Sequence, residues 1–524
     1  ELGKMKIEKT KNASRNIVFG VFLKLYQILF PFVMRTVMMY TIGVQYLGLN
    51  SLFTSILQVL NLAELGVGSA MVFSMYKPIA EDDSTTICAL MKLYKIYYRV
   101  IGGIILVIGL VLTPFIPRLI SGTIPADMNV YILYLLNLFA TVMTYWLFAY
   151  RNSILQAHQR NDVASKVTLG TDTVKYILQI VALVFLHNYY YFVIVLFLTQ
   201  ILNNIFTAIA AKKIFPQYNP KGNLPKEEIN QINGKIRDLF TSKLGYTIVS
   251  SADTIVISAF LGLTVLAQYQ NYYYIMSSVI GFMSIIYNSI TAGVGNSMLT
   301  KSVDQNYKEF RIFTLLVSFI NGICCACFMG VYQPFMKLWM GEAMLLPFSL
   351  VVLLCVYFWI YEYIMMASVY KDAGGIWHKD RFRPLISGVA NLGLNLLAVK
   401  FIGLYGIVLS TIVSMTIISA PWITTNIFKL IFKRSPIKYT IKLCYYAFSA
   451  AVASGISYIA IEFISIDGWL GLILKAIICV IVSSVIMMLF FFKMDEYADA
   501  VSLIMRMLHL DKKLHKGSKD NKVL

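Results

Sequence analysis

Charged residues are scarce in this chain. Asp, Glu, Lys and Arg make up 14% of its 524 residues, whereas hydrophobic residues make up 58% and the mean hydropathy is +0.70. Ordinary soluble domains carry about 25% charged residues. The shortage excludes a soluble globular protein and indicates that lipid is the natural solvent of most of the chain.

Cysteine is also sparse, and its positions exclude a disulfide scaffold. The seven cysteines fall in long apolar runs or at their ends, so no pair occupies an outside loop where oxidation could join it. The cluster Cys324, Cys325 and Cys327 has no histidine or carboxylate beside it in its apolar run. This cluster therefore indicates helix packing, and no metal site is expected.

The basic excess, 45 Lys and Arg against 26 Asp and Glu, does not indicate nucleic-acid binding. The basic residues lie between apolar runs and are not gathered on one face with stacking aromatic side chains. The sequence also lacks a glycine-rich loop followed by Lys and Ser or Thr, so no ATP-binding loop of that kind is expected.

Long apolar runs are abundant instead. A membrane-crossing helix needs about 20 apolar residues, and this criterion predicts an all-α polytopic membrane protein of about fourteen transmembrane helices. The predicted spans are 16–41, 49–76, 88–113, 128–150, 163–186, 189–211, 237–260, 264–298, 311–333, 344–370, 381–401, 404–429, 440–463 and 469–493.

The loops between these spans predict the orientation. An even number of spans puts both termini on one side, and loops rich in Lys and Arg stay in the cytoplasm. Basic residues gather in 1–15, in the connection 212–236 and in the tail, whereas the opposite loops hold only Arg118, Lys337 and Lys400. Both termini are therefore expected in the cytoplasm of a multi-pass cell-membrane protein. Within the tail 494–524, residues 494–510 are expected to form an amphipathic helix on the membrane surface, followed by a basic end.

Two short matches predict an internal repeat. Gly66–Met71 resembles Gly293–Met298, and Gly43 and Lys24 align with Gly262 and Lys243 under a second shift. The predicted organisation is listed here by residues: cytoplasmic N-terminus 1–15, N-terminal lobe 16–211, cytoplasmic linker 212–236, C-terminal lobe 237–430, two further spans in 431–493, and the tail 494–524.

Polar residues inside the predicted spans are the candidate site residues, because an ionisable group in hydrocarbon is costly unless it faces a wet cavity or a partner. The candidates for substrate binding in a polar cavity are Lys24, Arg35, Asn61, Lys243, Thr247, Ser250 and Asn288. The candidates for coupling to H⁺ or Na⁺ are Glu64, Asp172, Asp253 and Glu362.

Several of these residues have a plainer interpretation. Lys24 could extend its ammonium to the interface, and Arg35 could anchor its helix at the outer mouth. Asp172 and Lys175 are three residues apart and could neutralise each other on one helix. Glu64 and Glu362 could serve in helix-packing hydrogen bonds. These alternatives are left open by the sequence.

The segments Tyr46–Phe53, Leu62–Ala70 and Tyr76–Ala80 resemble the N-terminal signature of Wzx-type polysaccharide flippases. The resemblance implies the multidrug/oligosaccharidyl-lipid/polysaccharide (MOP) superfamily, whose fold is two six-helix bundles in a V, here with two extra C-terminal helices. It implies a bacterial flippase that moves undecaprenyl pyrophosphate-linked oligosaccharides across the cell membrane for capsule or exopolysaccharide synthesis. No bond chemistry and no cofactor is implied, and the expected partners are membrane lipid and the polysaccharide polymerase machinery.

Three alternatives remain beside this resemblance. A lipid II flippase would share the cavity and its chemistry. A multidrug antiporter of the MATE type would be expected to hold cationic drugs with acids, whereas the charge repeated within these spans is Lys. A membrane polysaccharide polymerase or ligase would be an enzyme with a sizeable outside loop, and the outside loops 114–127 and 334–343 are short.

Overall fold

The computed structural model describes residues 9–64, 66–122 and 124–507, and every regular element in these ranges is a helix. The α-helices are α1 (Lys9–Thr41), α2 (Val44–Leu60), α3 (Val67–Ala80), α4 (Ser84–Leu112), α5 (Val130–Trp146), α6 (Asn152–Ala157), α7 (Asn161–Val184), α8 (Tyr189–Ile214), α9 (Lys226–Leu261), α10 (Leu263–Thr300), α11 (Val303–Met340), α12 (Phe348–Ala373), α13 (Trp377–Asp380), α14 (Arg383–Ile402), α15 (Leu404–Ser414), α16 (Ala420–Ile427), α17 (Ile437–Glu462), α18 (Gly468–Phe491) and α19 (Asp495–Met507).

Short 3₁₀ and π turns join or extend some of these helices. The 3₁₀ turns are η1 (Asn61–Glu64), η2 (Thr113–Leu119), η3 (Ala149–Arg151) and η4 (Glu342–Met344), and the π turns are η5 (Met415–Ser419) and η6 (Phe428–Phe432). Together the helices confirm the all-α membrane fold expected from the sequence.

Twelve helices among the described residues are long and apolar enough to cross a membrane. A thirteenth span results if α5 and the η3–α6 segment, bent by 47° against each other, are counted as one. These thirteen correspond one to one with predicted spans. The remaining predicted span, 49–76, is not one regular helix, because its described residues divide into α2, η1 and α3.

The break has a local cause. Gly66 adopts a left-handed conformation with φ of 90°, which ends the run of helical backbone before α3 begins. Polar Asn61 and Glu64 lie in the 3₁₀ turn just before it. The repeat-equivalent segment around Gly293 stays inside the continuous helix α10, so the two repeats differ here.

The second repeat match, Gly43 with Gly262, has the same backbone conformation at both positions. Gly43 separates α1 from α2 with φ of 106°, and Gly262 separates α9 from α10 with φ of 90°. Residues with a Cβ atom rarely adopt such angles. Both glycines therefore end a long helix and start the next one in the same way, as expected for equivalent positions.

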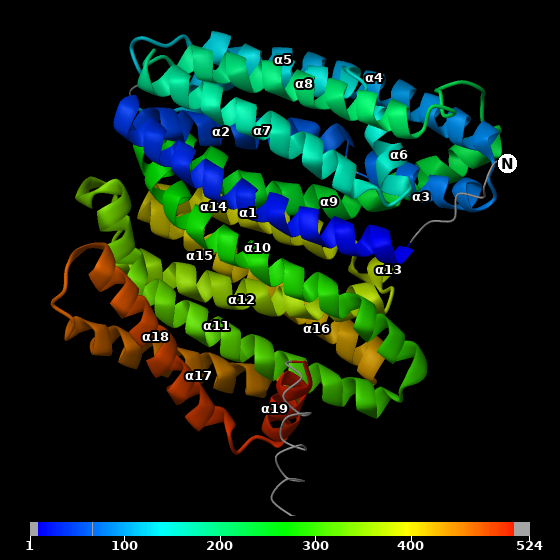
Figure 1. Ribbon diagram of the computed structural model, residues 1–524. Coiled ribbons are helices and arrows are strands. Elements are labelled where there is room, and N and C mark those ends of the chain that lie inside the picture. Colours follow the sequence, from blue (N-terminus) through cyan, green and yellow to red (C-terminus); the bar gives the residue numbers. More distant parts are fainter. Residues whose placement is uncertain (1–8, 65, 123, 508–524) are drawn as a thin grey trace, which may run out of the picture. The chain divides into compact units, whose positions relative to one another are not determined.

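The chain divides into two compact units, residues 1–270 with 384–407 (unit 1) and residues 271–383 with 408–524 (unit 2). In unit 1, α4, α5, α7 and α8 run side by side (Figure 1). Helices α9 and α14 also pack here, and a Cβ at Gly245 would lie 2.1 Å from the carbonyl carbon of Pro384. The units follow packing and not chain order, so the lobe boundaries stay a prediction.

The predicted linker 212–236 is partly helical and is fixed to α4. Helix α9 begins already at Lys226. Lys92 donates to Asn223 at 2.8 Å, and Tyr97 donates to Asn233 at 2.7 Å. The linker is therefore an ordered part of unit 1.

The core of unit 2 is a cluster of aromatic side chains. Phe310, Tyr370, Phe428, Phe432 and Tyr439 come from four different elements and are almost completely buried against one another. Aromatic side chains supply a large packed area, which joins these elements firmly.

The tail helix expected over 494–510 exists as α19, although residues 508–510 lie outside the described ranges. Acidic residues of its first turns form ion pairs with other helices of unit 2. Buried Glu496 accepts hydrogen bonds from Arg311 on α11 and Lys442 on α17, and Asp499 pairs with Lys308 at 2.7 Å. The sequence did not predict these ion pairs, because they join residues far apart in the chain.

We predict that Gly245→Ala loosens the contact between α9 and α14. The new Cβ would clash with backbone atoms of Pro384 and Leu385, and overpacking of this kind costs about 1–3 kcal/mol. Thermal unfolding of the purified protein in detergent should show a lower Tm. Gly103→Ala on α4 is the control, because its Cβ would meet nothing within 4 Å. A Tm for Gly245→Ala equal to that of the control would contradict the packing described.

Candidate functional site

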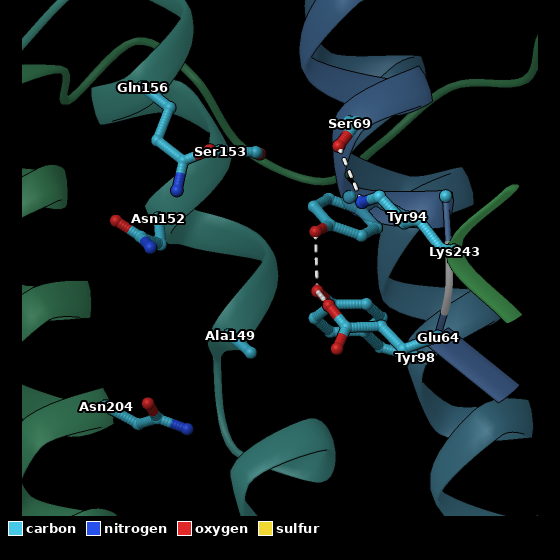
Figure 2. Close-up of a pocket in the computed structure, with 12 residues that line it drawn as sticks. Glu64, Ser69, Tyr94, Tyr98, Ala149, Asn152, Ser153, Gln156, Asn204 and Lys243 are labelled. Atoms are coloured by element: carbon cyan, nitrogen blue, oxygen red, sulfur yellow. Dashed lines mark hydrogen bonds between the residues drawn. The ribbon is translucent and has the colours of Figure 1, made fainter. Parts of the chain in front are cut away.

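A cavity of about 340 Å³ opens in unit 1 beside Glu64. Helical segments η1, α3, α4, η3, α6, α8 and α9 contribute its walls (Figure 2). The residues that line it are Glu64, Gly66, Gly68, Ser69, Tyr94, Tyr98, Ala149, Asn152, Ser153, Gln156, Asn204 and Lys243. Two of them, Glu64 and Lys243, are sequence candidates, so the fold brings together one acid and one base that are distant in the chain.

The carboxylate of Glu64 is held by phenol groups. Tyr98 donates to Oε1 at 2.6 Å, and Tyr145 donates to Oε2 at 3.0 Å. Tyr94 in turn donates to the hydroxyl of Tyr98 at 2.6 Å. Because an ionised carboxylate only accepts hydrogen bonds, this chain of donors satisfies Glu64 without a basic partner.

The break in the second predicted span places the start of α3 beside Glu64 and the tyrosine pair. Gly68 lies in the first turn of α3, where a Cβ would come within 3.1 Å of the Tyr94 hydroxyl and 3.7 Å of Glu64 Oε1. The missing side chain lets the start of α3 approach the tyrosine pair closely. The glycines at 66 and 68 therefore shape the wall of the cavity as well as the break.

Lys243 supplies the positive charge of the cavity. It lies on α9, and its Nζ donates to the Ser69 hydroxyl at 3.3 Å. No other basic side chain belongs to the described lining. An ammonium group at this place can bind an anionic group such as phosphate.

Side-chain amides face Lys243 from the other wall (Figure 2). Asn152 and Gln156 come from α6, and Asn204 comes from α8 and donates to the carbonyl of Thr144 at 2.7 Å. The Oδ1 atom of Asn152 is buried without a hydrogen-bond partner among the described residues. Amides that both donate and accept are suited to the hydroxyl groups of a sugar.

The remaining binding candidates do not line this cavity. Lys24 is exposed on α1, Arg35 is half-buried on the same helix, and Asn288 is exposed on α10 of unit 2. Thr247 is buried on α9, where its carbonyl accepts from Ser250 at 3.1 Å. Their role in substrate binding stays a prediction.

Asn61 lies in η1, the same turn as Glu64, and its Oδ1 atom is buried without a partner in the described structure. On the facing helix α9, Ser250 accepts a hydrogen bond from Gln58 at 3.3 Å. The second and seventh predicted spans are thus in polar contact near the cavity.

Asp253 forms a second polar cluster in unit 1. Its Oδ1 accepts from Asn395 of α14 at 2.6 Å, and the same amide nitrogen lies 3.4 Å from Oδ1 of Asn391. All three side chains are buried, and Oδ1 of Asn395 has no partner among the described residues. One carboxylate and two amides give a group of oxygen atoms of the kind that hard cations prefer.

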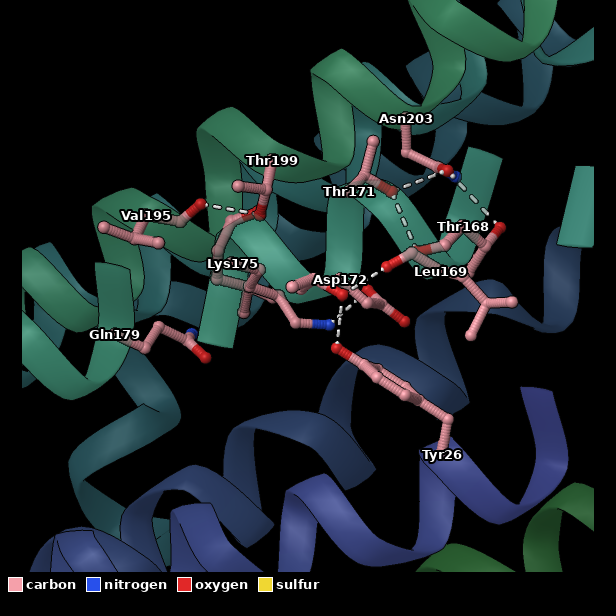
Figure 3. A network of polar contacts seen from close by, with 12 residues as sticks. Tyr26, Thr168, Leu169, Thr171, Asp172, Lys175, Gln179, Val195, Thr199 and Asn203 are labelled. Atoms are coloured by element: carbon pink, nitrogen blue, oxygen red, sulfur yellow. Dashed lines mark hydrogen bonds and ion pairs between the residues drawn. The ribbon is translucent and has the colours of Figure 1, made fainter. Parts of the chain in front are cut away.

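Asp172 and Lys175 make the ion pair that their spacing indicated, at 2.5 Å on α7 (Figure 3). The ammonium of Lys175 also lies 4.4 Å from the ring centre of Tyr176. Tyr26 of α1 bonds to Thr173 at 2.7 Å. The Tyr26–Thr173 bond fastens α1 to α7, and the ion pair within α7 favours the structural interpretation of Asp172.

Glu362 lies in unit 2 on α12 and is completely buried. Its Oε2 is 2.5 Å from the hydroxyl of Tyr287 on α10, and its Oε1 has no partner among the described residues.

Sequence reasoning missed most of the cavity wall. No tyrosine was among the sequence candidates, yet Tyr98 and Tyr145 hold Glu64. The one available signal was the spacing of Tyr94 and Tyr98, which puts both on one helical face. No pattern within a single span marks Asn152 and Asn204, because they meet only in the folded bundle.

No protein-family model and no curated protein matches this sequence. Solved structures do match its fold. The lipid II flippase MurJ, in an inward closed conformation, aligns with a TM-score of 0.63 and 14% identity over 91% of this chain and 99% of that chain. An inward-facing multidrug resistance MATE family transporter of the MOP superfamily aligns with a TM-score of 0.61 and 14% identity over 78% of this chain and 98% of that one.

A MATE structure in the bent conformation aligns less closely, with a TM-score of 0.52 and 14% identity over 84% of this chain and 97% of that chain. At such identities the likeness establishes a shared fold. This chain therefore has the all-helical membrane fold of MurJ and the MATE transporters.

We predict that Tyr98→Phe destabilises the protein by about 1.5–3 kcal/mol, the usual contribution of a hydrogen bond to a charged group. The substitution removes the donor to Oε1 of Glu64 and leaves the ring in place. Thermal unfolding in detergent would measure the effect. Tyr76→Phe is the control, because Tyr76 is exposed and its hydroxyl makes no hydrogen bond among the described residues. If both variants unfold at the same temperature, the phenol groups do not hold Glu64.

Proposed function

We propose that this chain is a Wzx-type flippase of the MOP superfamily. It moves undecaprenyl pyrophosphate-linked oligosaccharides from the cytoplasmic to the outer leaflet of a bacterial cell membrane by alternating access, for capsule or exopolysaccharide synthesis. The observation that carries the proposal is the cavity in which the ammonium of Lys243 faces the amides of Asn152, Gln156 and Asn204.

The chemistry of the cavity suits such a head group. A pyrophosphate-sugar group cannot cross about 30 Å of hydrocarbon without help. Lys243 offers a charge-assisted contact to phosphate, and the amides offer donors and acceptors to sugar hydroxyls. The polyprenyl tail needs no binding site of this kind, because it can stay in the surrounding lipid.

The position of the cavity also fits uptake from the cytoplasmic leaflet. Lys243 lies on α9, seven residues beyond the basic linker 212–236 that charge bias assigns to the cytoplasm. With a negative cell interior, each negative charge moved outward gains up to about 2.3 kcal/mol per 100 mV. The membrane potential therefore favours export of the head group.

The likeness to MurJ supports a lipid-linked substrate, because it extends over 91% of this chain, against 78% for the inward-facing MATE structure. Lipid II itself is an alternative substrate with the same chemistry. In the proposed role the protein makes and breaks no bonds, and the polysaccharide polymerase machinery would take up its product.

A second candidate function, antiport of cationic small molecules, is favoured by Glu64, whose carboxylate lines the same cavity. Both of its oxygens already accept from phenols, and Lys243 lines the same small cavity. A bound cation would have to displace these donors. The anionic substrate is therefore the better fit.

In this proposal Asp253, Asn391 and Asn395 hold a coupling cation, with Na⁺ as the candidate. Their oxygens lie together in unit 1, and one of them has no partner among the described residues. Asp253 was a coupling candidate from the sequence, and the two asparagines complete the group of ligands.

We predict that the chain restores surface polysaccharide in a bacterial strain whose own flippase has been deleted. Lys243→Ala should reduce the amount of restored polysaccharide at least about tenfold. The loss of one charge-assisted contact corresponds to roughly that factor. Surface polymer would be measured at matched protein abundance in the membrane.

Lys243→Arg should retain part of the rescue, and Lys77→Ala, an exposed lysine at the end of α3, should retain all of it. Full rescue by Lys243→Ala would contradict a phosphate-binding role for Lys243. Lys24→Ala tests the symmetry-related lysine in the same assay.

We predict that Na⁺ raises the Tm of the purified protein relative to choline at equal ionic strength, because a ligand that binds the folded state stabilises it, by about 2.7 kcal/mol at a hundredfold excess over Kd. Asp253→Asn should remove the dependence on Na⁺. An equal shift in the variant and the unmodified chain would show that the cation binds elsewhere.

A further inference from the structure

Glu362 of unit 2 has surroundings that differ from those of every other acid described above. Glu362 is 0% exposed, and no Lys, Arg or His among the described residues forms an ion pair with it. Only Tyr287 reaches its carboxyl group, at 2.5 Å from Oε2. An unpaired carboxylate oxygen in such a place costs several kcal/mol.

The titratable groups around Glu362 carry no positive charge. They are Tyr287 on α10, Cys324 and Cys325 on α11, and Tyr363 beside it on α12. Hard cations bind several oxygen atoms, whereas the side chains that contact Glu362 offer one carboxyl group and one phenol, without the amide oxygens that surround Asp253. The ligand that fits this site is a proton.

The position of the Tyr287 hydroxyl allows it to accept a hydrogen bond from a protonated Glu362. It lies 2.5 Å from Oε2 of Glu362 and 3.4 Å from the backbone carbonyl oxygen of the same residue. If the acid is protonated, its O–H donates to the phenol oxygen and the phenol O–H turns to that carbonyl. The remaining Oε1 is then an uncharged carbonyl oxygen, whose missing partner costs far less than that of a carboxylate.

The contact also has a counterpart in unit 1. Glu64 of the second predicted span meets Tyr145 of the fourth, and Tyr287 of the eighth meets Glu362 of the tenth. The sequence repeat relates the second span to the eighth, and chain order relates the fourth to the tenth. Each unit thus joins equivalent spans by a carboxyl–phenol bond, with the two residue types exchanged.

The two sites differ in their access to water. Glu64 lines an open cavity and has donors on both oxygens, whereas Glu362 is buried and its carboxyl group has one hydrogen-bond partner among the described residues. We propose that Glu362 is a proton-binding site of unit 2, occupied by a proton while α10 and α12 are packed as they are here and emptied when that contact opens to water. Its role in driving transport rests on the proposed flippase function, but the bound proton does not.

Infrared difference spectroscopy of the full chain in lipid tests the site directly, because a protonated carboxyl group absorbs apart from a carboxylate. At neutral pH and without substrate, we expect a protonated-acid band that disappears in Glu362→Gln and persists in Glu64→Gln. Tyr287→Phe should shift this band, because it removes the hydrogen bond to the acid.

If no protonated-acid band disappears in Glu362→Gln, the proposal is wrong. It is also wrong if the band disappears equally in Glu64→Gln. If Glu362→Gln fails to fold, the Tyr287→Phe shift decides: a shifted band supports the site, and an unshifted spectrum refutes it. Neither readout involves flipping, so a failure of the flippase proposal leaves this result unchanged.

Discussion

An ionisable side chain inside a lipid-embedded helix has no water to solvate it, so it must find a partner within the protein or bind one from outside. The chain meets this constraint in different ways. Asp172 pairs with a lysine on its own helix, Glu64 takes two phenol donors from other helices, and Asp253 takes an amide. Lys243 instead faces a cavity. The position of the candidate site follows from which charges are neutralised internally and which are not.

The fold could be predicted largely from the sequence, because apolar length and the distribution of Lys and Arg act locally along the chain. The break after α2 was missed, since its single signal was Gly66 beside polar residues in an otherwise apolar run. The ion pair Asp172–Lys175 was foreseen because both residues lie on one helix. The partners of Glu64 and Asp253 were not, because they come from spans far apart in the chain, and a single sequence does not show which spans meet.

The two predicted repeats differ in structure at one pair of matching positions. Gly43 and Gly262 break the chain alike, but Gly66 interrupts its span and Gly293 does not. The interruption brings Gly68, Glu64 and the tyrosine pair to the wall of a cavity in unit 1. In unit 2 the corresponding helix is continuous and the acid is sealed. The structure thus has a polar, open cavity in unit 1 and a completely buried acid, Glu362, in unit 2.

In the proposed function, the cavity beside Lys243 binds the head group of a pyrophosphate-linked oligosaccharide while the protein moves it across the bilayer. The most direct measurement uses the purified chain in vesicles that contain a fluorescent undecaprenyl pyrophosphate-linked oligosaccharide, with a membrane-impermeant quencher added outside. If the chain flips this lipid, fluorescence from the inner leaflet becomes accessible to the quencher much faster than in protein-free vesicles. Equal rates with and without the protein would contradict the proposed function.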